Sequence, residues 1–310
     1  MTRNHKAIPQ DILIFGAAAH IGGPLAQFLT QHAPAIRLRL ATSNAERAEK
    51  LRATFPAATV VIANYNDLPS LLTACEGVQG VFALTPSGTD EAPAMGNLIR
   101  ALKEVGEVRH MIRLLGMQPE SKLARIPQSL RNHGLGLPIQ HPIAKTMLDE
   151  SDLPVTYLNS GATFMDNFFG MRPGLQRDRC LIWPERLIPY IDPRDIAEVA
   201  ARLFLSDNHR HIGQFHTMNN GQDILRFSDV AQIMSEVWNE PIAYDGSEAR
   251  FKHEYAHLGE RRLQYLWDFF LYEQENEVVW SRNDFVQSIL GRNPVTVREW
   301  LVEHTSSMLG

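Results

Sequence analysis

The sequence predicts an α/β fold with a doubly wound parallel sheet and a smaller, mostly helical C-terminal domain. Short apolar runs alternate with helical patterns from residue 11 to about residue 220, which is typical of a parallel sheet with helices on both faces. A buried strand, a small-residue turn and a helix open the chain at residues 11–25, as in Rossmann-type sheets. The alternation ends near residue 220, so we expect the remainder to form the helical domain.

The first strand and its turn are the best candidate for a binding site. Ile12–Phe15 is a run of four apolar residues, typical of a strand buried on both faces. The turn that follows has the spacing Gly16-x-x-Ala19-x-x-Gly22 and leads into a helix, so its backbone N–H groups could bind a pyrophosphate. A packed turn that binds nothing is the alternative, because the Ala19 methyl narrows the approach that a glycine would allow. We expect cofactor contacts from Gly16, Ala18, Ala19, His20, Ile21 and Gly22.

The other elements follow from apolar runs and from helix start and stop signals. We predict strands at residues 36–41, 59–62, 80–84, 110–115 and 154–159, of which the β-branched strand 59–62 would be buried, and helices at residues 45–55, 92–105 and 142–150. Asn44 is a candidate N-cap, and Asp192 with Pro193 is a typical helix start. Ser281-x-x-Asp284 and Thr296-x-x-Glu299 have the spacing of capping boxes.

The domain boundaries follow from the same pattern. We predict that residues 1–160 form the Rossmann-type domain, with residues 186–218 returning to it. Residues 161–185 and 219–310 would then form the smaller domain, which binds substrate. The long loop at residues 117–139 has a length that is usually functional or mobile. Ligands of such sheets bind beyond the carboxyl ends of the strands, so site residues are expected in those loops.

Composition excludes several classes of function. The net charge of −5 argues against a nucleic-acid-binding surface. The two cysteines, Cys75 and Cys180, lie far apart, so neither a disulfide framework nor a zinc site is predicted. Residues 1–11 lack the apolar core of a signal peptide, and no apolar run approaches the ~20 residues that span a bilayer. We therefore expect a cytoplasmic protein that binds no membrane.

Several motifs resemble the NmrA-like branch of the atypical short-chain dehydrogenases. The turn at residues 16–22 stands where that family has GATGxxG, and residues 75–82 match its GVDxVF segment. Residues 153–167 are similar to LPYTxLRPGxFMxN, and Asp195-Ile196-Ala197 and Gly291–Pro294 also fit, in collinear order. The resemblance implies a Rossmann-type NAD(P)-binding protein. The family includes NAD(P)H-dependent quinone, dye and isoflavone reductases, and also regulators that bind dinucleotide without turning it over.

The sequence departs from the catalytic pattern of the short-chain dehydrogenases. Leu115 stands where a serine would end the fifth strand, and His141-x-x-x-Lys145 replaces the Tyr-x-x-x-Lys dyad. His141 and Lys145 are the catalytic candidates, since residues four apart share one face of a helix. His141 could donate a proton near neutral pH, or could cap the helix or line the substrate site instead. Lys145 could bind the nicotinamide ribose, or could be a surface lysine.

The end of the second strand bears on the choice of cofactor. Thr42, Ser43 and Asn44 follow it, without the acidic residue that would bind a ribose 2′-hydroxyl. Thr42, Ser43 and Arg47 could bind a 2′-phosphate, so NADP(H) is preferred, with NAD(H) as the alternative. The family's usual arginine directly after this strand is missing. The resemblance adds further cofactor contacts: Leu84, Thr85, Pro86, Lys145, Asn159, Gly161 and Phe164. His133 and His141 lack a third ligand at suitable spacing, so no metal site is predicted.

The sequence thus predicts an NAD(P)H-dependent reductase of a small apolar conjugated carbonyl or quinone-like compound, acting by direct hydride transfer. A dinucleotide sensor that acts through a protein partner and a redox-neutral enzyme on the same fold are the alternatives. Aromatic residues at 265–272 would fill the core between the domains, and some would line an apolar substrate pocket. The expected partners are a small-molecule substrate and, as an option, a second copy of the chain in a homodimer.

Overall fold

The structure, a computed structural model, describes residues 5–118, 126–134 and 136–310. Their contacts divide the chain into two compact units. The first unit comprises the described residues within Met1–Met117, Leu135–Ser160 and Arg194–Thr217, and the second those within Gln118–Gly134, Gly161–Pro193 and Met218–Gly310. Among the described residues, 118, 126–134 and 186–193 therefore belong to the second unit, although the sequence pattern places them in the first.

The first unit is built on a seven-stranded sheet in the order β3-β2-β1-β4-β5-β6-β10. Every neighbouring pair in this sheet is parallel. The strands are β1 (Asp11–Phe15), β2 (Arg37–Thr42), β3 (Thr59–Ile62), β4 (Gly80–Ala83), β5 (His110–Leu115), β6 (Val155–Asn159) and β10 (Phe215–Thr217). The strand order reverses direction between β1 and β4, as in a doubly wound sheet, which confirms the predicted fold class.

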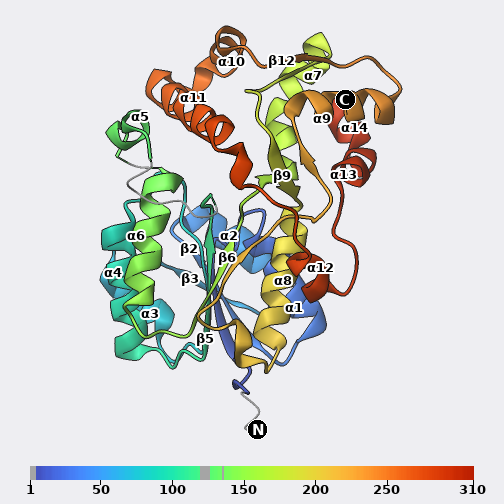
Figure 1. Cartoon of the computed structure of the whole chain (residues 1–310). Coiled ribbons are helices and arrows are strands. Elements are labelled where there is room, and N and C mark those ends of the chain that lie inside the picture. Colours follow the sequence, from blue (N-terminus) through green and yellow to red (C-terminus); the bar gives the residue numbers. More distant parts are fainter. Residues whose placement is uncertain (1–4, 119–125, 135) are drawn as a thin grey trace. The chain divides into compact units, whose positions relative to one another are not determined.

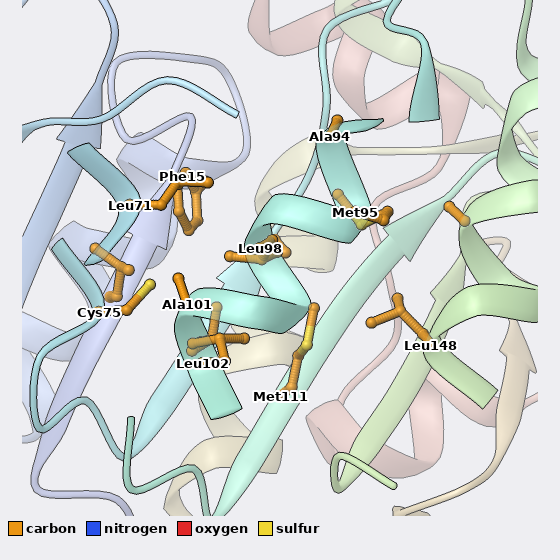
Figure 2. Close-up of a cluster of buried hydrophobic side chains, with 14 of the residues drawn as sticks. Phe15, Leu71, Cys75, Ala94, Met95, Leu98, Ala101, Leu102, Met111 and Leu148 are labelled. Atoms are coloured by element: carbon orange, nitrogen blue, oxygen red, sulfur yellow. The ribbon is translucent and has the colours of Figure 1, made fainter. Parts of the chain in front are cut away.

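Helices cover both faces of this sheet (Figure 1). They are α1 (Gly22–His32), α2 (Ala45–Thr54), α3 (Leu68–Cys75), α4 (Glu91–Val105), α6 (Leu137–Asp149) and α8 (Pro193–Leu205). α3, α4 and α6 lie on one face, where α4 packs against both neighbours, and α1 and α8 lie on the other. Figure 2 shows Leu71 and Cys75 of α3, Leu98 and Leu102 of α4 and Met111 of β5 in one continuous core.

The predicted elements of the first unit are present, with four differences. The edge strand β10 was not predicted. β3 was predicted to be buried, but it is an edge strand and Ile62 is 48% exposed. α3 was not predicted, and α6 begins at Leu137 rather than near residue 142. The predicted N-cap Asn44 is confirmed, because its side chain accepts a hydrogen bond from the Arg47 backbone N–H at 2.9 Å. Among the described residues, no helix combines the length and the apolar character that crossing a membrane requires.

The second unit is mostly helical and contains two small sheets, with strand orders β11-β9-β7 and β12-β8. Its strands are β7 (Thr163–Phe164), β8 (Cys180–Ile182), β9 (Ile188–Ile191), β11 (Ile224–Leu225) and β12 (Ala243–Asp245). Its α-helices are α5 (Gln128–Asn132), α7 (Arg172–Asp178), α9 (Phe227–Trp238), α10 (Glu248–Glu254), α11 (Glu260–Glu275), α12 (Phe285–Leu290), α13 (Val297–Glu303) and α14 (Thr305–Leu309). Part of the predicted loop at residues 117–139 lies outside the described residues, and α5 occupies another part of it.

The N-termini of α12 and α13 show whether the two predicted capping boxes form. Thr296 and Glu299 form the predicted capping box at the start of α13. Ser281 does not form one, since α12 begins at Phe285 with Asp284 as its N-cap and without a side-chain cap. Spacing alone therefore identified one of the two boxes.

The aromatic residues predicted for the domain core lie on α11 and pack within the second unit. Phe270 and Tyr272 are buried there. The guanidinium of Arg186 lies 4.2 Å from the centroid of the Phe270 ring, and its Nε donates to the Glu273 carboxylate at 2.5 Å. A buried ion pair and aromatic packing thus hold α11 to the segment before β9.

A buried histidine makes the stability of the first unit depend on pH. The Thr156 hydroxyl donates to the His211 carbonyl at 2.8 Å and therefore accepts from Nε2 of His110, 2.9 Å away. Burial, aided by the nearby Lys6 and His211, lowers the pKa of His110 to about 3. An unfolded histidine has a pKa of about 6.5, so the folded state favours the neutral ring. The resulting stability is present above about pH 6.5 and is lost as the pH falls toward 3.

We predict that His110→Gln flattens the pH dependence of the free energy of unfolding between about pH 6 and 4. One histidine kept neutral by folding contributes a slope of up to ~1.4 kcal/mol per pH unit. Urea unfolding at a series of pH values measures this slope for the variant and the parent protein. An unchanged slope in a folded His110→Gln protein would show that His110 is not responsible.

Candidate functional site

The turn between β1 and α1 has the geometry expected of a phosphate-binding turn. Gly16 adopts a φ of +69°, a conformation that glycine reaches without strain. A Cβ atom at Gly22 would lie 2.3 Å from the Gly16 carbonyl oxygen, so only glycine permits this start of α1. The Ala19 N–H donates to the same oxygen at 2.9 Å. The turn is therefore closed by its two glycines, while Ala18, Ala19 and His20 remain exposed.

The N-terminus of α1 is suited to bind an anion. Its N-cap is Ile21, which is buried and whose apolar side chain offers no acceptor to the first-turn amides. The helix contains 11 residues, enough for its backbone dipoles to add at this end. The Gly23 N–H already donates to the Ala19 carbonyl at 2.9 Å, and Pro24 has no N–H. The positive end of the helix, rather than a row of free first-turn amides, therefore favours a phosphate or pyrophosphate here.

A groove of about 520 Å³ extends from this turn between α1 and α2. Two cationic side chains of α2, Arg47 and Lys50, line it together with residues 17–19 of the turn. Ser43 is exposed at the end of β2, and the Thr42 hydroxyl accepts a hydrogen bond from the Asn44 N–H at 3.2 Å. Arg47, a predicted ligand of the 2′-phosphate, thus lines the same groove as the turn. Lys50 was not predicted from the sequence. It lies one helical turn after Glu46 and forms an ion pair with it at 2.7 Å.

The loop after β4 lies against the turn. A Cβ atom at Gly16 would meet the side chain of Leu84 at 2.8 Å, so these two predicted contacts are neighbours. The Leu84 carbonyl accepts a hydrogen bond from the Tyr65 hydroxyl at 2.9 Å. Thr85 follows, and its hydroxyl donates to the Glu91 carboxylate, so that side chain points away from solvent toward α4.

A buried network of charged and polar side chains lies behind the loops after β4 and β5. We call it the Arg113 network, and its members are Thr85, Glu91, Arg113 and His141. Nη2 of Arg113 donates to Glu91 at 2.6 Å and to the Thr85 hydroxyl at 2.9 Å. Sequence reasoning missed Glu91 and Arg113. The signal was present, since Arg113 is a charged residue in the middle of an otherwise apolar strand.

The environment of His141 contradicts a role that depends on titration near neutral pH. Its Nδ1 accepts the Gly116 N–H at 2.7 Å, so the ring proton is on Nε2, which lies 4.0 Å from the Glu91 carboxylate. Burial and the nearby Arg113 lower the pKa of His141 to about 3. The imidazole is therefore neutral at physiological pH and supports the loop after β5.

Lys145 contacts a different part of the unit. Its Nζ pairs with Asp149 at 2.6 Å and lies 4.8 Å from the centroid of the Tyr157 ring. Asp149 also accepts a hydrogen bond from the Tyr157 hydroxyl at 2.7 Å. Lys145 and His141 share a helix, but their side chains contact different residues, and Lys145 holds α6 against β6.

The remaining predicted contacts fall in two places. Asn159 is fully buried at the end of β6, where its amide binds both the N–H and the carbonyl of Met117, at 2.7 and 2.8 Å. It therefore supports the loop after β5 from within. Gly161 and Phe164 belong to the second unit, where Phe164 pairs with Ile191. Among the described residues, no group of three potential ligands could hold a metal ion.

The second unit contains a small cavity beside its aromatic cluster. Its volume is about 90 Å³, and Trp267, Phe270 and Leu271 of α11 line it. A cavity of this size holds only a few atoms, so within this unit the aromatic residues serve mainly as core.

Comparison with known proteins agrees with the motifs. The model of the NmrA-like family matches residues 9–301. The chain is 24% identical over 303 residues to the (4-alkanoyl-5-oxo-2,5-dihydrofuran-3-yl)methyl phosphate reductase of Streptomyces griseus, covering 96% of this chain and 98% of that protein. These matches confirm the family resemblance inferred from residues 16–22, 75–82 and 153–167.

Two solved structures share the fold over nearly the whole chain. The NADPH-dependent quinone oxidoreductase QOR2 of Escherichia coli, solved with NADPH, superposes with a TM-score of 0.77 at 22% identity, covering 95% of this chain and 99% of that one. NmrA, a negative transcriptional regulator solved with NADP, superposes with a TM-score of 0.73 at 16% identity, covering 96% and 95% of the two chains. The same fold thus occurs in an oxidoreductase and in a regulator.

We predict that the His141 imidazole does not titrate between pH 5 and 8. The burial of the ring and the acceptor role of Nδ1 both oppose protonation. Carbon–proton correlation NMR of the ring, assigned with His141→Gln, follows its chemical shift with pH. A midpoint near the ordinary value of about 6.5 would contradict the buried, neutral state.

Proposed function

Because this chain belongs to the NmrA-like family, we propose that it is an NAD(P)H-dependent reductase of a small apolar conjugated carbonyl or quinone-like compound. The observation that carries the proposal is the turn between β1 and α1, with its exposed residues 18–20 and the adjoining groove. Two of the similar proteins are a dihydrofuranone phosphate reductase and a quinone oxidoreductase, and they support the class of reaction.

The turn and the loop after β4 would hold the cofactor. The backbone N–H groups near Ala18–Gly22 would bind the pyrophosphate at the positive N-terminal end of α1. Leu84, Thr85 and Pro86 would line the same cofactor site. Thr85 would do so through its backbone, because its hydroxyl already binds Glu91. Asn159 would act indirectly, through the loop that it holds.

NADP(H) is the preferred cofactor in this proposal. Thr42 and Ser43 bring no negative charge to the end of β2, so a 2′-phosphate would meet no repulsion from this strand end. Arg47 and Lys50 line the groove, and a guanidinium can bind a phosphate with charge-assisted hydrogen bonds. NAD(H) would lose these contacts and bind more weakly.

In the proposed reaction, the cofactor would supply the hydride and solvent would supply the proton. The nicotinamide of a bound NADPH supplies a hydride. The chain would hold the two reactants in place and exclude competing geometries. Because His141 is neutral and its Nδ1 accepts a hydrogen bond, we assign the proton to solvent rather than to this residue. Lys145 is assigned no contact with the cofactor, since it pairs with Asp149.

A dinucleotide sensor is the second candidate. It is favoured by Leu115 and His141 at the positions where the parent superfamily has serine and tyrosine. The fold of the NADP-bound regulator NmrA supports it as well. A sensor would bind dinucleotide with the same turn but would turn nothing over.

We predict that the protein binds NADPH and oxidises it in the presence of quinones or enones, and that Ala19→Asp abolishes both. The new carboxylate would stand on the exposed turn and repel the pyrophosphate without disturbing the fold. Nicotinamide fluorescence measures binding, and loss of NADPH absorbance measures turnover.

Gln31→Glu, an equal change of charge at the far end of α1, is the matched control and should bind like the parent protein. Saturable binding without turnover of any acceptor would favour the sensor. No binding at millimolar NADPH would refute both functions.

We predict that Arg47→Ala weakens NADPH binding by about ten-fold or more and leaves NADH nearly unchanged. A charged hydrogen bond to the 2′-phosphate is worth roughly 1.5–3 kcal/mol, and ~1.4 kcal/mol corresponds to ten-fold. Arg52→Ala, on the same helix but outside the groove, is the control. Equal losses for both dinucleotides would mean that Arg47 is structural.

A further inference from the structure

Arg113 occupies a position that normally requires an apolar side chain. It lies within β5, whose six residues are all buried, and its side chain is 0% exposed. Its partner Glu91 is the first residue of α4 and is 1% exposed. A fully buried guanidinium and carboxylate lose most of their hydration, so their presence needs an explanation other than burial of surface.

Stability alone does not explain this ion pair. Buried ion pairs contribute little net stability compared with apolar residues of similar volume, because desolvation offsets their attraction. In this one, Nε and Nη1 of Arg113 and Oε2 of Glu91 have no hydrogen-bond partner among the described residues. A pair selected for stability would have these donors and acceptors satisfied.

The contacts of the pair lead to the loops beyond two neighbouring strands. Arg113 and Glu91 both bind the Thr85 hydroxyl, at the start of the loop after β4. On the other side, the Glu91 carboxylate lies 4.0 Å from Nε2 of His141, whose Nδ1 accepts the N–H of Gly116 in the loop after β5. The Glu91 N–H also donates to Gln140 at 2.8 Å, which joins the start of α4 to α6.

We propose that Arg113 is a positioning residue of the dinucleotide site, which fixes the loops after β4 and β5 through Glu91, Thr85 and His141. The inference rests on the proposed function, because the carboxyl ends of β4 and β5 are where a doubly wound sheet binds its ligand. Two loops tied to one buried ion pair keep a fixed spacing. The backbone that faces the ligand is then already in place before binding, which lowers the cost of ordering it.

The test separates positioning from folding by comparing three variants. Arg113→Met leaves the Glu91 carboxylate buried without its cation and should lower the thermal stability of the protein. Arg113→Met with Glu91→Gln removes both charges and should regain most of that stability. Arg39→Met is the matched control, because Arg39 pairs with the buried Asp11 at 3.1 Å near the amino ends of β1 and β2.

Two readouts are measured on each variant. The first is hydrogen exchange of the backbone at residues 84–90 and 114–118 without cofactor, and the second is kcat/KM for NADPH oxidation. We expect faster exchange in both segments for the single and the double variant. We also expect kcat/KM to fall, on the order of 10²-fold for a misplacement of about 1 Å, even where the double variant has regained its stability. Arg39→Met should change neither exchange at these segments nor kcat/KM beyond its effect on the folded fraction.

Recovery of loop protection and kcat/KM together with stability in the double variant would overturn the proposal and make the pair purely structural. Unchanged exchange in a folded single variant would do the same. The exchange experiment needs no ligand. A parent protein that fails to bind NADPH would therefore refute the proposed function, while the effect of Arg113 on the two loops would still be measured.

Discussion

The approach of Gly22 to the carbonyl oxygen of Gly16 is the constraint on which the site depends. A Cβ atom there would lie 2.3 Å from that oxygen, so α1 can start this close to β1 only with glycine. The close start sets the first amides of α1 beside the turn and leaves residues 18–20 exposed. The alanine at position 19 is compatible with this geometry, since this residue is exposed. The Ala19 methyl limits the room for a ligand, but it does not prevent the turn from folding.

Two buried ion pairs occur at opposite ends of the sheet, and they differ in a way that bears on function. Near the amino ends of the strands, Arg39 pairs with Asp11 but remains 23% exposed and so keeps part of its hydration. Near the carboxyl ends, Arg113 and Glu91 are both fully buried and incompletely hydrogen-bonded. The pair with the larger desolvation cost, Arg113–Glu91, lies at the end of the sheet where ligands bind. This is expected if the pair serves to position the loops there rather than to stabilise the fold.

The sequence predicted six of the seven strands of the first unit and several helices, because apolar runs and caps such as Asn44 are local signals. It predicted none of the short strands described in the second unit. It failed where the answer depends on neighbours that are distant in the chain. The composition of β3 is that of a buried strand, but its place at the sheet edge exposes Ile62. His141 and Lys145 were correctly placed on one helix. Which strands each side chain meets, and hence the protonation state of His141, is set by tertiary packing. Tertiary packing also explains why Lys50 was missed: it lines the groove only because α1 and α2 lie on either side of it.

The state of His141 restricts the kind of acceptor that the proposed reductase could use. Its ring has one proton, on Nε2, and releasing that proton would create an imidazolate 4.0 Å from the Glu91 carboxylate. Such a step is electrostatically unfavourable in a buried site. With the proton assigned to solvent, the acceptor must itself bear the negative charge that hydride transfer creates. Conjugated carbonyls and quinones do so by delocalisation, whereas an isolated ketone would need a strong hydrogen-bond donor. A neutral His141 thus agrees with the conjugated acceptors that we propose, for which the chain would only have to position the reactants.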